Sequence, residues 1–315
     1  MGIFSMSNMK SVIKKLYKET YIGKLLISPI KGLYDWYRFK IIPDDVYIKK
    51  VFEKNLGYKL NLQNPVTLNE KIQWLKLNDR TKLHTKCADK YAVREYVKEK
   101  IGEQYLIPLL YQTENHKDIT DINMPDEPFI IKTNHDSGGV VIVKDKSSIN
   151  WKQVQKELSL SMKNNYYYPG REWQYKNIKP SIVVEKLLLD ENNKIPNDYK
   201  LHCFNGKSKV IQVDMSRFEK HRRNLYDNNW NLLECEWLCS NGKDISKPKN
   251  IDKMIKLAEI LAKDFTYVRV DLYSVKEKIY FGELTFHTES GWGKFSSKEC
   301  DKKFGELLSL ESFFT

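Results

Sequence analysis

The stretch RVDLYSVKEKIYFGEL, residues 269–284, constrains the fold most, because it predicts two strands joined by a short charged turn. With the turn centred on Glu277, Asp271 faces Glu283 across an antiparallel hairpin. Opposed like charges are destabilising, so a further feature must be proposed for that face of the hairpin. The same register opposes Arg269 to Thr285, Tyr273 to Phe281 and Val275 to Ile279.

The other face of this hairpin is apolar, because successive side chains of a strand point to opposite sides. We expect it to pack on a core and the carboxylate face to point toward a cleft or solvent. The apolar face consists of Val270, Leu272, Leu284 and Phe286.

The rest of the chain predicts an α+β protein of two or three subdomains. A helical region over 66–101 begins with Thr67 and Glu70, the spacing of a capping box. Further on we expect a strand near Pro108, a polar boundary at 112–127, a helix at 151–162, a strand in PSIVVEKLLLD, and a helix in NIDKMIKLAEILAKDF. Hairpins are predicted at 129–143, with a loop at 134–139, and around Asn205-Gly206.

Composition favours a folded protein inside the cell. The chain has 315 residues, 41% of them hydrophobic, and no apolar run long enough to span a bilayer. Its five cysteines are widely spread with no CxxC pair, so we expect neither a disulfide framework nor a zinc site, and a reduced, cytoplasmic setting.

The net charge of +12 favours polyanionic partners, although an ordinary lysine-rich surface explains it equally well. Residues 1–40 hold eight Lys or Arg against Glu19 and Asp35, interleaved with aromatic and aliphatic residues. That mixture suits either peripheral association with an anionic membrane surface or an ordinary helical extension. No nucleic-acid partner is expected.

In FIIKTNHDSGG, a lysine leaves a buried strand just before a glycine loop, an arrangement that can hold phosphates. VVEKLL, DYK, RVD and GEL follow in that order. Together these motifs resemble the ATP-grasp superfamily, most closely its D-alanine ligase branch. Over about residues 65–310 the chain is similar to the TupA-like family of bacterial surface-polysaccharide synthesis.

The resemblance implies an ATP-grasp fold, in which two α+β subdomains clasp ATP next to a helical N-terminal region. The implied domains are a basic N-terminal extension (1–60), a pre-grasp region (61–125), a central ATP-grasp subdomain with the phosphate loop (126–186) and a C-terminal subdomain with the metal site (187–315).

It also implies a nucleotide site. Lys90 and Lys132 would contact the phosphates, and Glu185 would accept from the adenine amino group. The phosphate lid would be Asp136, Ser137, Gly138 and Gly139; the backbone from Lys186 to Leu188 would read the base edge, and either Asp190 or Glu191 would bind the ribose.

The resemblance assigns most catalytic and metal-binding roles to residues in or next to the hairpin at 269–284. Asp271 and Glu283 would bind Mg²⁺, with Thr285 standing where the family usually has asparagine. Arg269 would steady the acylphosphate and the oxyanion, and Lys200 would approach the γ-phosphate.

Acceptor-site candidates lie in TFHTESGWGKF and YYYPGREWQYKNIKP. A structural histidine and simple packing are the alternatives for these two stretches. The candidate residues are His287, Ser290, Gly291 and Arg171.

The implied activity is an ATP-dependent carboxylate–amine ligase using ATP and Mg²⁺. Its substrates would be a free or glycan-linked carboxylate, such as a uronic acid of a surface polysaccharide precursor, and an amine donor. A phosphotransferase or glycosyltransferase of polysaccharide synthesis is an alternative, though no DxD motif supports the latter. A basic protein that binds polyanions or membranes without catalysis is another.

Overall fold

The structure is a computed structural model that describes residues 33–34, 36–215 and 221–313. It divides into two compact units, 1–51 and 52–315. The first unit contains the short helix η1 (Tyr37–Ile41) and the beginning of α3 (Asp44–Leu56). The expected membrane-associating segment 1–40 lies almost wholly outside the described residues. No helix in the described ranges is long and apolar enough to cross a bilayer.

The second unit begins with three helices, α4 (Leu68–Asn78), α5 (Lys82–Ala88) and α6 (Val93–Lys100). The predicted capping box is present: the Thr67 hydroxyl accepts from the Glu70 N–H, and the Glu70 carboxylate accepts from the Thr67 N–H. The helical region is interrupted after α5, where Asp89 accepts the N–H groups of Tyr91 and Ala92.

A four-stranded antiparallel sheet follows, in the order β1-β4-β2-β3. Helix α7 (Trp151–Lys163) covers one face by packing Val154 and Leu158 in a core with Ile131 and Val184. Since side chains alternate along β2, Lys132 points away from α7. The strands are β1 (Leu109–Thr113), β2 (Phe129–Thr133), β3 (Val141–Val143) and β4 (Ile182–Lys186).

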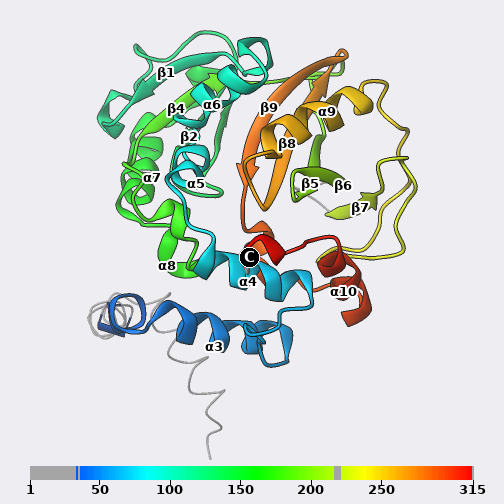
Figure 1. Ribbon diagram of the computed structural model, residues 1–315. Helices are drawn as coiled ribbons and strands as arrows, with labels where there is room; N and C mark the ends of the chain where they lie inside the picture. Colours follow the sequence, from blue (N-terminus) through cyan, green and yellow to red (C-terminus); the bar gives the residue numbers. More distant parts are fainter. Residues whose placement is uncertain (1–32, 35, 216–220, 314–315) are drawn as a thin grey trace, which may run out of the picture. The chain divides into compact units, whose positions relative to one another are not determined.

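A second antiparallel sheet has five strands in the order β7-β6-β5-β8-β9 (Figure 1). Helix α9 (Ile251–Ala262) packs on it, and the predicted apolar face of the hairpin is buried in the same core. Asn205 and Gly206 make the predicted turn, both with positive φ. The strands are β5 (Asp198–Phe204), β6 (Lys207–Met215), β7 (Arg222–Tyr226), β8 (Tyr267–Val275) and β9 (Lys278–Thr285).

Short elements join or flank the two sheets, and both sheets with their helices confirm the predicted α+β class. The short elements are η2 (Glu103–Tyr105), η3 (His116–Asp118), η4 (Lys146–Ser148), α8 (Tyr167–Gly170), η5 (Trp173–Tyr175), η6 (Thr288–Gly291), α10 (Lys298–Glu306) and η7 (Glu311–Phe313).

The register of the β8–β9 hairpin is only partly as predicted. Asp271 does face Glu283, and Arg269 faces Thr285. The outer pairs are wrong, because the turn contains two residues, Lys276 and Glu277, rather than being centred on Glu277. The observed outer pairs are Leu272–Phe281, Tyr273–Tyr280, Ser274–Ile279 and Val275–Lys278.

A β-bulge at Gly282 explains why the inner pairs survive this error. One extra residue on β9 offsets the shorter turn, so the two deviations cancel at Asp271 and Glu283. A Cβ at Gly282 would lie 3.0 Å from the Asp271 carbonyl oxygen, a close approach that favours glycine.

The expectation of no disulfide is wrong, since Cys235 and Cys300 are bonded. They are 65 residues apart in sequence, and both lie in the core cluster where α10 packs near α4. Sequence spacing does not reveal such a tertiary pairing.

We predict that thiol titration of the denatured, unreduced protein detects three thiols, those of Cys87, Cys203 and Cys239, and that reduction raises the count to five. Cys235→Ser combined with Cys300→Ser should leave the unreduced count at three. Five thiols before reduction would contradict the disulfide.

Candidate active site

Charged side chains of alternating sign cross the five-stranded sheet and form a ladder. Arg269 Nε lies 2.7 Å from Asp271 Oδ1, and Arg269 Nη2 lies 2.9 Å from Glu283 Oε1. Lys200 Nζ is 3.6 Å from carboxylate oxygens of both Asp271 and Asp214. In order, the ladder is Glu283, Arg269, Asp271, Lys200, Asp214, Arg223 and Glu289.

Arg269 resolves the conflict between the two opposed carboxylates. Burial by itself lowers the pKa of Arg269, but Asp271 and Glu283 outweigh it and raise that pKa well above its ordinary value. Burial raises the pKa of Asp271 to about 6, against the opposing effect of Arg269 and Lys200. The buried guanidinium therefore stays charged and holds both carboxylates in position.

Glu283 is where several predicted cations converge. Burial works to raise its pKa, yet Arg269, Lys90, Lys200 and Lys132 together lower it below the ordinary value. Its side chain is 41% exposed and lines a hollow shared with Lys90, Asp136 and Gly282. The structure thus brings together residues that the sequence placed in separate motifs.

On the four-stranded sheet, Lys132 and Glu185 lie on the face opposite α7. Lys132 Nζ is 3.0 Å from Glu185 Oε2, and Arg94 Nη1 is 2.9 Å from Glu185 Oε1. Arg94 Nη2 also donates to the Ile107 carbonyl, which fixes α6 beside the strand. Sequence reasoning missed Arg94, because nothing local distinguishes it from a surface arginine.

The glycine loop is tied to Lys90, whose ammonium donates to the Asp136 carbonyl and lies 3.7 Å from the Asp136 carboxylate. The rest of the predicted lid is exposed, and its two glycines have positive φ. The exposed lid residues are Ser137, Gly138 and Gly139.

The predicted base-reading segment continues from β4. The Lys186 side chain contacts Glu127, and the backbone N–H groups of Lys186 and Leu187 donate to the carbonyls of Pro108 and Pro128. Asp190 accepts the N–H groups of Asn192 and Lys194, whereas Glu191 is exposed. Both acids stay candidates for binding the ribose.

The acceptor-site candidates gather around the fully buried Lys76 of α4. Its Nζ donates to the carbonyls of Gly170 (2.7 Å) and Ser290 (2.6 Å). The Ser290 hydroxyl donates to Glu172, and His287 Nδ1 lies 3.9 Å from the same carboxylate. Burial lowers the pKa of Lys76 to about 7 and raises that of Glu172.

Two other candidates border this cluster. Arg171 is almost completely buried, with its guanidinium over the Tyr167 ring, and Gly291 is held by a hydrogen bond from Gln73 to its carbonyl. The acceptor role of all four candidate residues stays a prediction.

Several residues of the ladder, and Asp198 beside it, escaped the sequence reasoning although signals for some were present. Asp198 lies two residues before Lys200 on β5, so strand alternation places both on one face, and they are in contact. Asp214 interrupts an apolar run on β6 and accepts from Arg223 Nε at 2.7 Å. A buried acid in such a run indicates a partner, but not which one.

The donor set fits a magnesium ion completed by phosphate oxygens. Among the described residues, no group of three or more His, Cys, Asp or Glu side chains could hold a metal alone. Mg²⁺ is commonly bound by one or two carboxylates together with substrate phosphates. Asp271 and Glu283 would supply the carboxylates, and Thr285, whose hydroxyl donates to Glu283 at 3.2 Å, would add only a neutral oxygen.

A model of the TupA-like ATPgrasp family matches residues 70–309. No curated protein matches the chain.

Three solved structures illustrate what the fold is similar to, each with a TM-score of 0.37. D-alanine–D-alanine ligase from Bacillus anthracis is 18% identical over 64% of this chain and 57% of its own. PurK, N5-carboxyaminoimidazole ribonucleotide synthetase, in complex with ADP, is 14% identical over 69% and 50%. The ATP-grasp ligase PsnB, in complex with a precursor variant, Mg and ADP, is 9% identical over 69% and 57%. The chain spans between 50% and 57% of the length of these proteins.

We predict that Lys132→Ala weakens ATP binding by about tenfold, the loss expected for one ammonium–phosphate contact. Arg94 still pairs with Glu185 in this variant, so folding should be preserved. Isothermal titration calorimetry would measure the change. Lys179→Ala, which removes an exposed ion pair with Glu114, is the control; equal affinity for both variants would contradict the phosphate role.

Proposed function

This chain belongs to the TupA-like ATP-grasp family, and from that premise we propose that it is an ATP-dependent carboxylate–amine ligase. The family match covers most of the chain and confirms both the sequence-based recognition and the ATP-grasp fold. The single observation that supports the activity most is the ladder, because it gathers two metal-type carboxylates, an arginine and a lysine beside one hollow.

The nucleotide would lie against the hollow lined by Lys90, Asp136 and Glu283. Lys90 and Lys132 would bind its phosphates, and the glycine loop would close over them. Glu185 would accept from the adenine amino group. Asp271 and Glu283 would hold Mg²⁺, which neutralises phosphate charge when bound.

In the proposed reaction, a carboxylate oxygen attacks the γ-phosphorus of ATP. A bond from oxygen to phosphorus forms, ADP leaves, and an acylphosphate results. An amine then attacks the acyl carbon, loses a proton and expels inorganic phosphate to give an amide. Lys200 would neutralise the transferred phosphoryl group, and Arg269 would stabilise the oxyanion.

Arg269 and Lys200 suit these roles because both are buried and fixed. Each is already positioned by carboxylates of the ladder, so little reorganisation accompanies the reaction.

We further propose that the acid is a carboxylate of a surface polysaccharide precursor, such as a uronic acid, and that the amine is an amino acid or similar donor. The resemblance of the sequence to a family of bacterial surface-polysaccharide synthesis motivates this choice of substrate class. The use of ATP favours a cytoplasmic reaction.

The ligase proposal is tested by incubating the protein with ATP, Mg²⁺ and uronic acids, with and without amino acids. We expect release of inorganic phosphate and an amide product, both dependent on acid and amine together. If ADP forms and the phosphate stays on a stable product, the protein is a phosphotransferase and the ligase proposal fails.

We predict that Glu283→Gln and Asp271→Asn each lower ATP turnover by at least about a hundredfold, because Mg²⁺ loses a charged ligand. Glu283→Gln is the cleaner variant, since Arg269 keeps its contacts with Asp271. Circular dichroism would verify folding, and Glu277→Gln at the exposed hairpin turn is the control. Normal turnover in either site variant would reject the metal assignment.

A further inference from the structure

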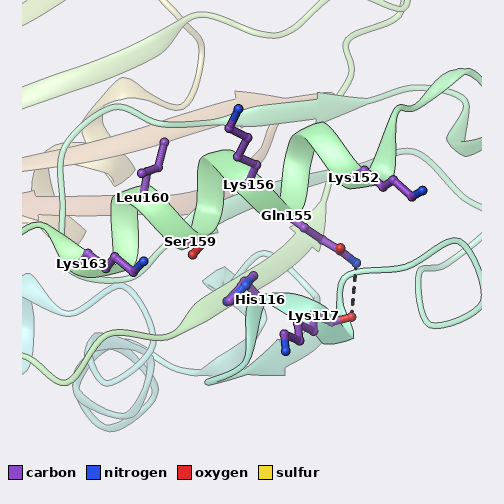
Figure 2. A pocket seen from close by; sticks show the side chains of 8 residues that line it. All are labelled: His116, Lys117, Lys152, Gln155, Lys156, Ser159, Leu160 and Lys163. Atoms are coloured by element: carbon purple, nitrogen blue, oxygen red, sulfur yellow. Dashed lines mark hydrogen bonds between the residues drawn. The ribbon is translucent and has the colours of Figure 1, made fainter. Parts of the chain in front are cut away.

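A second hollow, of about 370 Å³, lies between α7 and η3 on the outer side of the four-stranded sheet. Figure 2 shows the side chains that surround it. Because α7 and Lys132 lie on opposite faces of the sheet, this hollow is separate from the candidate active site. Its lining residues are His116, Lys117, Lys152, Gln155, Lys156, Ser159, Leu160 and Lys163.

The side chains that line this hollow include four lysines and no acidic residue. Its four lysines are exposed, and no carboxylate among the described residues lies within ion-pair distance of their ammonium groups. Neighbouring lysines differ, since Lys146 pairs with Asp126 and Lys179 with Glu114. The one acid of α7, Glu157, accepts from Gln153 and does not line the hollow.

The hollow is also fixed in shape. The Gln155 amide donates to the carbonyls of Lys117 (3.3 Å) and Ile119 (2.9 Å), which joins η3 to α7 (Figure 2). Helix α7 in turn buries Val154 and Leu158 in the core. Lys152, Lys156 and Lys163 belong to α7 and Lys117 belongs to η3, so both elements that border the hollow contribute lysines.

We propose that this hollow binds a segment of an acidic polysaccharide chain, through carboxylate or phosphate groups that contact the lysines. The inference rests on the proposed function in one respect, since it makes the acceptor part of a longer anionic glycan. Ser159 and Gln155 add polar groups of the kind that pair with sugar hydroxyls.

Other anionic partners fit the hollow less well. Binding to a membrane surface requires a broad apolar face next to the cations, but Leu160 is the single aliphatic side chain of the lining. Single-stranded nucleic acid is bound by stacking bases on aromatic side chains, and the lining contains no Phe, Tyr or Trp. A concave site with lysines at its rim suits a narrow, flexible polyanion.

The test compares the full-length protein with the double variant Lys152→Glu/Lys156→Glu. Binding of oligogalacturonate, a polyanion of carboxylated sugars, is measured by calorimetry without ATP or amine. We expect the variant to bind at least about tenfold more weakly, because two attractive contacts become repulsive. ATP turnover with a monomeric uronic acid should be unchanged.

The control is Lys298→Glu/Lys302→Glu on α10, which makes the same charge change at the same helical spacing on exposed lysines. If both double variants lose the same amount of oligogalacturonate binding, the effect comes from the overall charge of the protein, and the proposed binding site is wrong. Stronger binding of anionic vesicles or single-stranded DNA than of oligogalacturonate would overturn the glycan assignment. Failure of the ligase assay with intact oligogalacturonate binding would reject the proposed activity alone.

Discussion

The candidate site depends on the contacts that the Arg269 guanidinium makes with both Asp271 and Glu283. Two carboxylates face each other across an antiparallel pair, an arrangement that is unfavourable without a cation. The guanidinium is buried together with Asp271 and also contacts the partly exposed Glu283, so its charge is compensated at short range and its donors are used. Removal of Arg269 would leave the two opposed carboxylates without the guanidinium between them, and a buried charge that loses its partner is the costly case.

The same reasoning extends across the sheet. Lys200 lies between Asp271 and Asp214, and Arg223 lies between Asp214 and Glu289. Each cation thus lies between two carboxylates. A change in the charge of one ladder residue therefore alters the electrostatic environment of its neighbours. This connects the hairpin with the segment after β9, where the acceptor-site candidates His287, Ser290 and Gly291 lie.

Local rules predicted much of the architecture. The capping box at Thr67, the Asn205-Gly206 turn and the inner pair of the β8–β9 hairpin depend on residues close in sequence. Features that need the order of strands were missed, such as the approach of Asp214 to Lys200 and of Arg94 to Glu185. The Cys235–Cys300 bond and the cluster around Lys76 likewise depend on contacts between distant segments.

The bulge at Gly282 has a consequence for how the hairpin tolerates changes of length. Because the extra residue lies between the turn and the carboxylates, it separates the register of the tip from that of the site. The tip is therefore free to vary in sequence, whereas the three residues on the site side of the bulge, from Glu283 to Thr285, keep their partners. A deletion in the turn accompanied by loss of the bulge would exchange the two faces of the part of β9 between the turn and the bulge. Apolar side chains of that part would then point to the face that carries the carboxylates.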